Sequence, residues 1–264
     1  RSREPLCGEA PGAAAPGLDS RRGGRARGEP PSLRHFLSSR RTHGAVAGVV
    51  AISGSAGQGK THLLLQAASD LLTAGTPAIV LMGQRFSSGA WWPDVRAQLG
   101  LGDVDIDGFL GALSSMAEAT GRRALIFIDA LNESRDPRSW AAERPSLLDT
   151  TARYPWLGVV LTWRTDYQDL ILGDLGLTVT RHPGLAGVEP EALANYCELF
   201  DVAVPDVAVF DSAFSNPLFL RMYCELIADD PAVGIGSEGR SQIFTQFARL
   251  KSRAVIERLR LSPS

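Results

Sequence analysis

One short segment constrains the fold more than any other part of the chain. Residues 54–61 read GSAGQGKT, which places Gly54, Gly59, Lys60 and Thr61 at the spacing glycine, four residues, glycine, lysine, serine or threonine. Glycines at such positions let backbone N–H groups converge on an anion, while the lysine and the threonine add a compact positive charge and a hydroxyl. The pattern predicts a phosphate-binding loop, or P-loop.

The flanking residues favour the same interpretation. Residues 48–53, GVVAIS, form an apolar, β-branched run typical of a buried strand, and residues 61–75 have helical apolar spacing that ends at a glycine. A helix that starts at the loop adds its positive end to the anion site. We therefore expect the loop to bind nucleotide phosphates through Gly54, Ser55, Ala56, Gly57, Gln58, Gly59, Lys60, Thr61 and His62.

Within the loop, two side chains have distinct expected roles. Only Lys60 and Lys251 are lysines among the 27 basic residues, so a lysine in the loop indicates a site that rejects a broad guanidinium group. We expect Lys60 to reach the β- and γ-phosphates and the Thr61 hydroxyl to bind Mg²⁺.

The rest of the chain alternates between apolar runs and helical patterns. Strands are predicted near 48–53, 77–83, 123–129 and 157–163, with a weak strand at 177–180. Helices are predicted at 60–73, near 92–99, 107–120 and 139–153, and again in three stretches after residue 189. This order predicts an α/β fold, a P-loop NTPase with a mostly parallel five-stranded sheet covered by helices and followed by a small helical lid region.

Three regions are expected from these patterns. Residues 1–32 are rich in Arg, Gly, Pro and Ala and read as a disordered linker. Residues 33–188, which begin with a short helix at 33–46, would form the NTPase domain, and residues 189–264 the lid region. Both ends of the sequence look cut, so we interpret the chain as a fragment of a longer protein.

Charge and cysteine content narrow the setting. The net charge of −2 does not indicate direct nucleic-acid binding, and no apolar run reaches transmembrane length. Cys7, Cys197 and Cys224 are odd in number and lack metal-ligand spacing, which suits buried or idle thiols in a reducing compartment. We expect a cytoplasmic protein with no membrane partner and no metal other than Mg²⁺.

A second motif, ALIFIDALNES at 124–134, follows the loop. Four apolar residues lead to Asp129 at the carboxyl end of a strand, where its carboxylate can hold the Mg²⁺ shell opposite Thr61. The alternative is an aspartate that caps a helix. Glu133 is a candidate for the base that polarises the attacking water, or else a glutamate in the first turn of a helix.

Two further stretches carry candidate residues. The strand VVLTWR ends at Arg164, which would emerge near the γ-phosphate if this strand lies between the loop strand and the Asp129 strand. It would then sense that phosphate; the alternative is a surface arginine paired with Asp166 or Asp169. In NPLFL at 216–220, Asn216 and Pro217 form a good helix start, which a well-capped core helix would also have.

Together, GSAGQGKTHLL, LIFIDALNES, LTWRTDY and NPLFL resemble the STAND class of ATPases, within it NACHT-type proteins, and above all bacterial antiviral-defence members of the AVAST kind. The resemblance covers about residues 46–230. It implies an ATP-operated switch that cycles between ATP and ADP, is flanked by effector and sensor domains, and self-associates on activation. It also implies that Lys60, Asp129, Glu133 and Arg164 serve catalysis, and that Pro217 packs near the adenine.

The sequence departs from this family at two positions. Asn132 stands where many NACHT proteins have aspartate, and Ala130 fills the position of the catalytic glutamate of many related ATPases. Glu133 is then the only nearby candidate base, so we expect slow hydrolysis.

Three alternatives remain open. They are an AAA+-like motor or DNA-loading ATPase, a scaffold that binds nucleotide without cleaving it, and a phosphoryl-transfer kinase, for which neither an acceptor pocket nor a base on the acceptor can be placed. The sequence has no Asn-Lys-x-Asp motif of Ras-like GTPases and no Leu-Ser-Gly-Gly signature of transporter ATPases.

Overall fold

The computed structural model describes residues 48–87, 90–173, 177, 179–204, 212–230 and 240–259. In these residues the chain forms a five-stranded sheet with the strand order β2-β3-β4-β1-β5. All four strand pairings are parallel. The predicted parallel α/β sheet is therefore confirmed.

The elements of the described residues follow the predicted order. The strands are β1 (Val49–Gly54), β2 (Ala78–Met82), β3 (Ala124–Asp129), β4 (Leu157–Arg164) and β5 (Val179–Arg181). The α-helices are α2 (Lys60–Thr73), α3 (Trp91–Leu99), α4 (Ile106–Thr120), α5 (Ser139–Ala152), α6 (Gln168–Leu172), α7 (Glu189–Phe200), α8 (Pro217–Asp229) and α9 (Arg240–Leu259). Short 3-10 helices are η1 (Gly83–Arg85), η2 (Leu131–Glu133), η3 (Thr165–Tyr167) and η4 (Ser212–Ser215).

Short elements account for the differences from the sequence-based prediction. The weak strand expected at 177–180 is observed as Val179–Arg181, and neither α6 nor the 3-10 helices were predicted. Elements of three to five residues are too short to show an apolar period. The linker predicted at 1–32 and the helix predicted at 33–46 lie outside the described residues.

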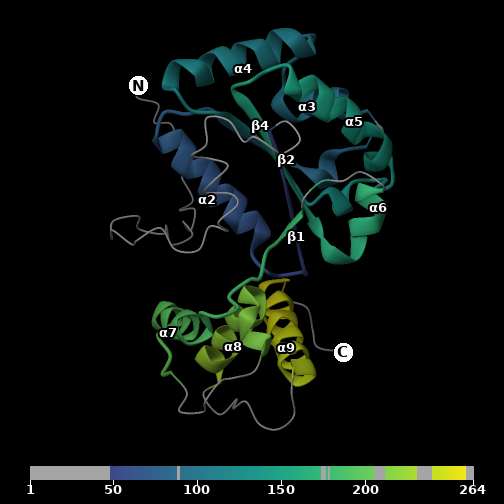
Figure 1. Cartoon of the computed structure of the whole chain (residues 1–264). Helices are drawn as coiled ribbons and strands as arrows, with labels where there is room; N and C mark the ends of the chain where they lie inside the picture. The colour runs from purple at the N-terminus through teal and green to yellow at the C-terminus, as the bar shows by residue number, and fades with distance from the viewer. Residues whose placement is uncertain are drawn as a thin grey trace, which may run out of the picture.

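Alternating strand residues divide the core into two layers. On one face, Val50, Ile52 and Phe127 pack against α2, which contributes Leu64 and Leu71. Successive strand side chains point to opposite faces, so their neighbours pack on the other side of the sheet. Figure 1 shows α2 on one side of the sheet and α3–α6 on the other.

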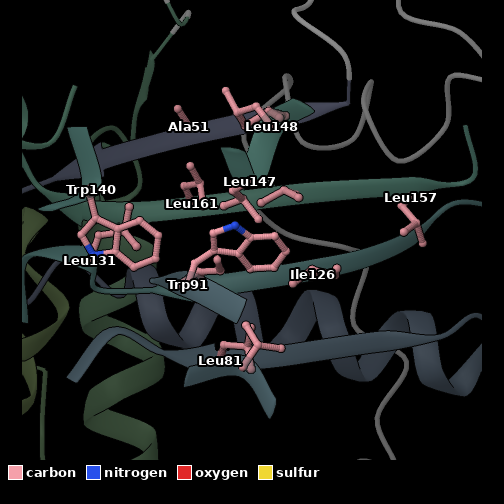
Figure 2. Packing of buried hydrophobic residues seen from close by; sticks show 14 of the residues in the cluster. Ala51, Leu81, Trp91, Ile126, Leu131, Trp140, Leu147, Leu148, Leu157 and Leu161 are labelled. Carbon is pink, nitrogen blue, oxygen red and sulfur yellow. The ribbon is translucent and has the colours of Figure 1, made fainter. Parts of the chain in front are cut away.

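The second layer is larger and rich in tryptophan. Trp91 of α3 and Trp140 of α5 are buried against Ile126 and Leu161 of the sheet, as Figure 2 shows. The rings of Phe86 and Trp140 meet edge to face with centroids 5.0 Å apart. This layer fixes the carboxyl ends of β2 and β3, where the candidate site lies.

The helices α7, α8 and α9 pack around a third cluster of buried residues, which includes Leu193, Phe214, Leu220 and Tyr223. They lie together beyond the carboxyl ends of the strands (Figure 1). The division of the chain at residue 188 into an NTPase domain and a lid region stays a prediction.

Candidate functional site

The loop between β1 and α2 has the backbone that its glycines suggest. Gly57 and Gly59 have φ of 76° and 86°, in the left-handed region that favours glycine. At Gly54 the reason is space, since an added Cβ would lie 2.7 Å from Gln58 Oε1 and 3.1 Å from the carbonyl oxygen of His182. The loop thus needs glycine at these three positions.

The Lys60 ammonium lies along the loop. Its Nζ donates to the carbonyl oxygens of Gly54 at 2.7 Å and of Ser55 at 2.9 Å. Partial burial lowers the pKa of Lys60, and the nearby Asp129 carboxylate opposes that shift. An ammonium has three N–H donors, so one remains beyond these two bonds to meet a phosphate oxygen.

Asp129 joins the loop helix to the neighbouring strand. Its Oδ2 accepts a hydrogen bond from Thr61 Oγ1 at 2.6 Å, and its Oδ1 accepts one from Thr162 Oγ1 at 2.6 Å. Thr162 Oγ1 in turn accepts from the backbone N–H of Ala130 at 2.9 Å. Asp129 is 2% exposed and lies at the end of a strand, so the helix-cap alternative does not describe it.

This arrangement can be tested against the group it was expected to hold. Mg²⁺ prefers hard oxygen ligands and binds through one or two protein groups together with phosphates and waters. The Thr61 hydroxyl and the Asp129 carboxylate are such oxygens, and they meet at the P-loop. The residues present therefore fit Mg²⁺.

Arg164 and Glu133 form an ion pair beside the loop. Arg164 Nη2 lies 3.1 Å from Glu133 Oε1, and the two side chains are 44% and 40% exposed. The register of β1 and β4 pairs Arg164 with Gly54, because β4 lies between β1 and β3 as the sensor interpretation requires. Arg164 is thus paired with Glu133 in place of the Asp166 or Asp169 considered from the sequence.

The backbone that follows Asp129 is tightly confined. Ala130 has φ of 55°, a left-handed conformation that is costly for a residue with a side chain. Gly83, at the end of β2, approaches it so closely that an added Cβ would lie 2.1 Å from the carbonyl oxygen of Ala130. Gly83 is therefore part of what holds Asp129 in place.

The start of α8 contacts the loop directly. Asn216 Nδ2 donates to the carbonyl oxygen of Ala56 at 2.9 Å, and the Leu218 N–H lies 3.3 Å from the carbonyl oxygen of Gly57. Pro217 Cγ lies 3.6 Å from the position of a Cβ at Gly59. Pro217 is thus beside the loop, while its expected contact with adenine stays a prediction.

Two features of the site were missed from the sequence. His182, just after β5, is buried; its backbone N–H donates to Ser53, and its imidazole forms a hydrogen bond with the Gln58 backbone. Burial lowers the pKa of His182. Gln58 was expected to face phosphate, but its Oε1 accepts from the Ser55 N–H at 2.6 Å. A lone histidine after a weak strand gives no sequence signal.

The remaining loop candidates lie on the surface. Ser55, Ala56 and His62 are exposed, with His62 in the first turn of α2. Within the described ranges, no three His, Cys, Asp or Glu side chains are grouped so as to hold a metal ion. Among the helices that can be described, none is long and apolar enough to cross a bilayer.

Comparisons with known proteins bear on the fold. No protein-family model and no curated protein matches the sequence. Among solved structures, AMPPCP-bound DnaA from Aquifex aeolicus matches with a TM-score of 0.50 and 16% identity, over 85% of this chain and 66% of that chain. Domain III of the Thermotoga maritima replication initiation protein DnaA matches with a TM-score of 0.50 and 14% identity, over 82% of this chain and 89% of that one.

A further match is a replication initiator DnaA bound to AMPPCP and single-stranded DNA, with a TM-score of 0.45 and 14% identity over 86% of this chain. The chain spans 62%, 58% and 66% of three of the solved structures that it matches. Identities this low carry the fold alone. The chain has the P-loop NTPase fold that domain III of DnaA also has.

Proposed function

We propose that the chain is an ATP-binding, slowly hydrolysing P-loop ATPase that acts as a nucleotide-operated switch within a larger protein. The observation that carries the proposal is the 2.6 Å hydrogen bond between Thr61 Oγ1 and Asp129 Oδ2. It brings together two oxygens from sequence positions far apart, at the end of a loop with the P-loop spacing. A structural turn would not need this pair, whereas a site for Mg²⁺ and nucleotide phosphates does.

The proposed roles follow from the contacts. Residues 54–61 would hold the phosphates through backbone N–H groups, and Lys60 would reach the β- and γ-phosphates. Thr61 and Asp129 would hold Mg²⁺, which neutralises phosphate charge when bound. Thr162 orients the Asp129 carboxylate by donating to Oδ1.

Slow turnover is part of the proposal. Ala130 has no group that could activate water, and the nearby carboxylate of Glu133 is paired with Arg164. Arg164 would sense the γ-phosphate by leaving Glu133 for it, and Glu133 would then be free to polarise water. In the resting protein the base and the sensor restrain each other.

Two classes of switch are compatible with this chemistry. The motifs of the sequence support a STAND, NACHT-like module of the AVAST antiviral-defence kind, with a helical lid from residue 189 and self-association on activation. The likeness to DnaA supports an AAA+-like DNA-loading ATPase at least as well. DNA as a partner, which the charge of the chain does not indicate, enters with this second candidate.

The first experiment is a calorimetric titration of ATP and ADP with and without Mg²⁺. We expect binding by the unaltered chain and loss of binding in Lys60→Ala. Lys251→Ala is a matched control, because its ammonium pairs with Glu225 on α8. Equal affinities in both variants would refute a phosphate-binding role for Lys60.

The second experiment separates the two classes. We would measure ATP hydrolysis with and without single- and double-stranded DNA. Stimulation of tenfold or more, on the order expected of a DNA-coupled motor, would favour the AAA+-like candidate. Slow turnover that DNA leaves unchanged, together with tight retention of ADP, would favour the STAND-like switch.

A further inference from the structure

The side chain of Asn216 does two things at once. Its Oδ1 accepts from the backbone N–H groups of Leu218 at 3.0 Å and Phe219 at 3.2 Å, which caps the start of α8. Its Nδ2 donates to the carbonyl oxygen of Ala56 in the P-loop at 2.9 Å. A cap alone would need only the oxygen, so the loop contact is an additional function of this amide.

The contacts of α8 fall on two successive peptide units of the loop. Asn216 Nδ2 bonds the carbonyl of Ala56, and the Leu218 N–H lies against the carbonyl of Gly57. A trans peptide is planar, and its N–H points opposite to its C=O. The two contacts therefore fix the direction of the N–H groups of Gly57 and Gln58, which point away from α8.

The packing at Gly57 shows how closely the two parts fit. An added Cβ there would lie 2.8 Å from Asn216 Oδ1 and 2.9 Å from Leu218 Cβ. Gly57 is thus required by this contact as well as by its φ of 76°. The loop and α8 are in contact without any ligand between them on this side.

We propose that Asn216 is a positioning residue for phosphate binding, because it orients the P-loop amides of Gly57 and Gln58 from outside the loop. The inference rests on the proposed nucleotide binding. A phosphate on the inner N–H side polarises each peptide unit and strengthens the bond on its carbonyl side. Since such coupling is reciprocal, the same bond transmits phosphate binding to α8.

The test separates the cap from the loop contact. Asn216→Ser keeps a capping oxygen, but the serine side chain is one atom too short to reach Ala56, while Asn216→Ala loses both functions. Asn195→Ser, an exposed asparagine on α7, is the matched control. Affinities for Mg-ADP and Mg-ATP are measured by calorimetry, and folding by thermal unfolding.

We expect Asn216→Ser to bind ADP and ATP each about 3- to 12-fold more weakly, the effect of one neutral hydrogen bond. Both nucleotides should lose the same factor, because both carry the β-phosphate. Asn216→Ala should lose a similar factor and also melt about 2–4 °C lower than Asn216→Ser, because it lacks the cap. Asn195→Ser should bind both nucleotides like the unaltered chain.

Amide hydrogen exchange supplies a readout that a purely structural cap would not move. Adding ADP should slow exchange of the Leu218 and Phe219 amides in the unaltered chain and leave them unchanged in Asn216→Ser. Wild-type affinity and wild-type exchange in Asn216→Ser would overturn the inference alone. If the unaltered chain binds no nucleotide, the proposed function fails, and this inference with it.

Discussion

Replacing Gly83 with alanine tests how the Asp129 carboxylate is held in place. An added Cβ would lie 2.1 Å from the carbonyl oxygen of Ala130, 2.6 Å from its carbonyl carbon and 2.7 Å from the carbonyl oxygen of Asp129. All three are backbone atoms, so none can rotate away. Gly83 is absent from the residues with positive φ, and alanine there would act through space alone.

The size of the effect follows from these distances. Real Cβ atoms essentially never come closer than 3.0 Å to such atoms, so the backbone must separate by about 1 Å. Overpacking of this kind costs about 1–3 kcal/mol, or about 3–10 °C in melting temperature. A shift of this size at Asp129 would stretch its 2.6 Å bond with Thr61 beyond hydrogen-bond range.

The assay compares nucleotide affinity with and without Mg²⁺. We expect Gly83→Ala to lose most of the gain in affinity that Mg²⁺ gives and to keep the Mg²⁺-independent part, which rests on Lys60 and the loop. Gly111→Ala is the control, since its Cβ would meet only Tyr154 Cε1 at 3.9 Å and should stabilise α4 by about 0.5–1 kcal/mol. Equal melting temperatures and equal Mg²⁺ effects in the two variants would refute the reasoning.

Four further predictions concern the same site. Arg164→Ala should weaken ATP binding about tenfold or more and leave ADP unchanged by calorimetry; an equal loss for both nucleotides would count against a γ-phosphate sensor. Glu133→Gln should slow hydrolysis at least about 100-fold at unchanged affinity, and unchanged turnover would remove Glu133 from the mechanism. Thr162→Val should cost about 1–3 kcal/mol in denaturant unfolding, because the Ala130 N–H loses its acceptor. Burial lowers the pKa of His182 below 6.5, so its contribution to stability is complete above that pH and is lost as pH falls toward the folded-state pKa; His182→Gln should flatten the pH dependence of melting between about 4 and 6.5.

The parts of the site that the sequence could predict are those coded by neighbouring residues. The loop spacing at 54–61 and the apolar run before Asp129 each contain their own structural signal, because strand, turn and helix follow one another in the chain. Strand order was also within reach, since Arg164 at the end of an apolar run has few places to go in a parallel sheet. The observed order β3-β4-β1 agrees with the order that the sensor interpretation required.

The parts that the sequence could not predict depend on register and on contacts across the fold. Thr162 matters because it lies opposite Asp129 on the adjacent strand, and a shift of one residue would turn its hydroxyl to the other face. His182 matters because a three-residue strand ends beside the loop. Asn216 was visible as a helix cap, but its bond to Ala56 joins residues 160 positions apart.

The two halves of the candidate site differ in how firmly they are held, and this difference favours a switch over a fast enzyme. Asp129 is buried and bonded on both oxygens by threonine hydroxyls, so little reorganisation is needed when Mg²⁺ and phosphates arrive. Arg164 and Glu133, by contrast, are more than a third exposed and satisfy each other, so their pair must separate before either can act on the γ-phosphate. Binding is thus prepared in advance, whereas hydrolysis requires a rearrangement. A trigger that separates the Arg164–Glu133 pair would therefore raise turnover with little change in ADP affinity.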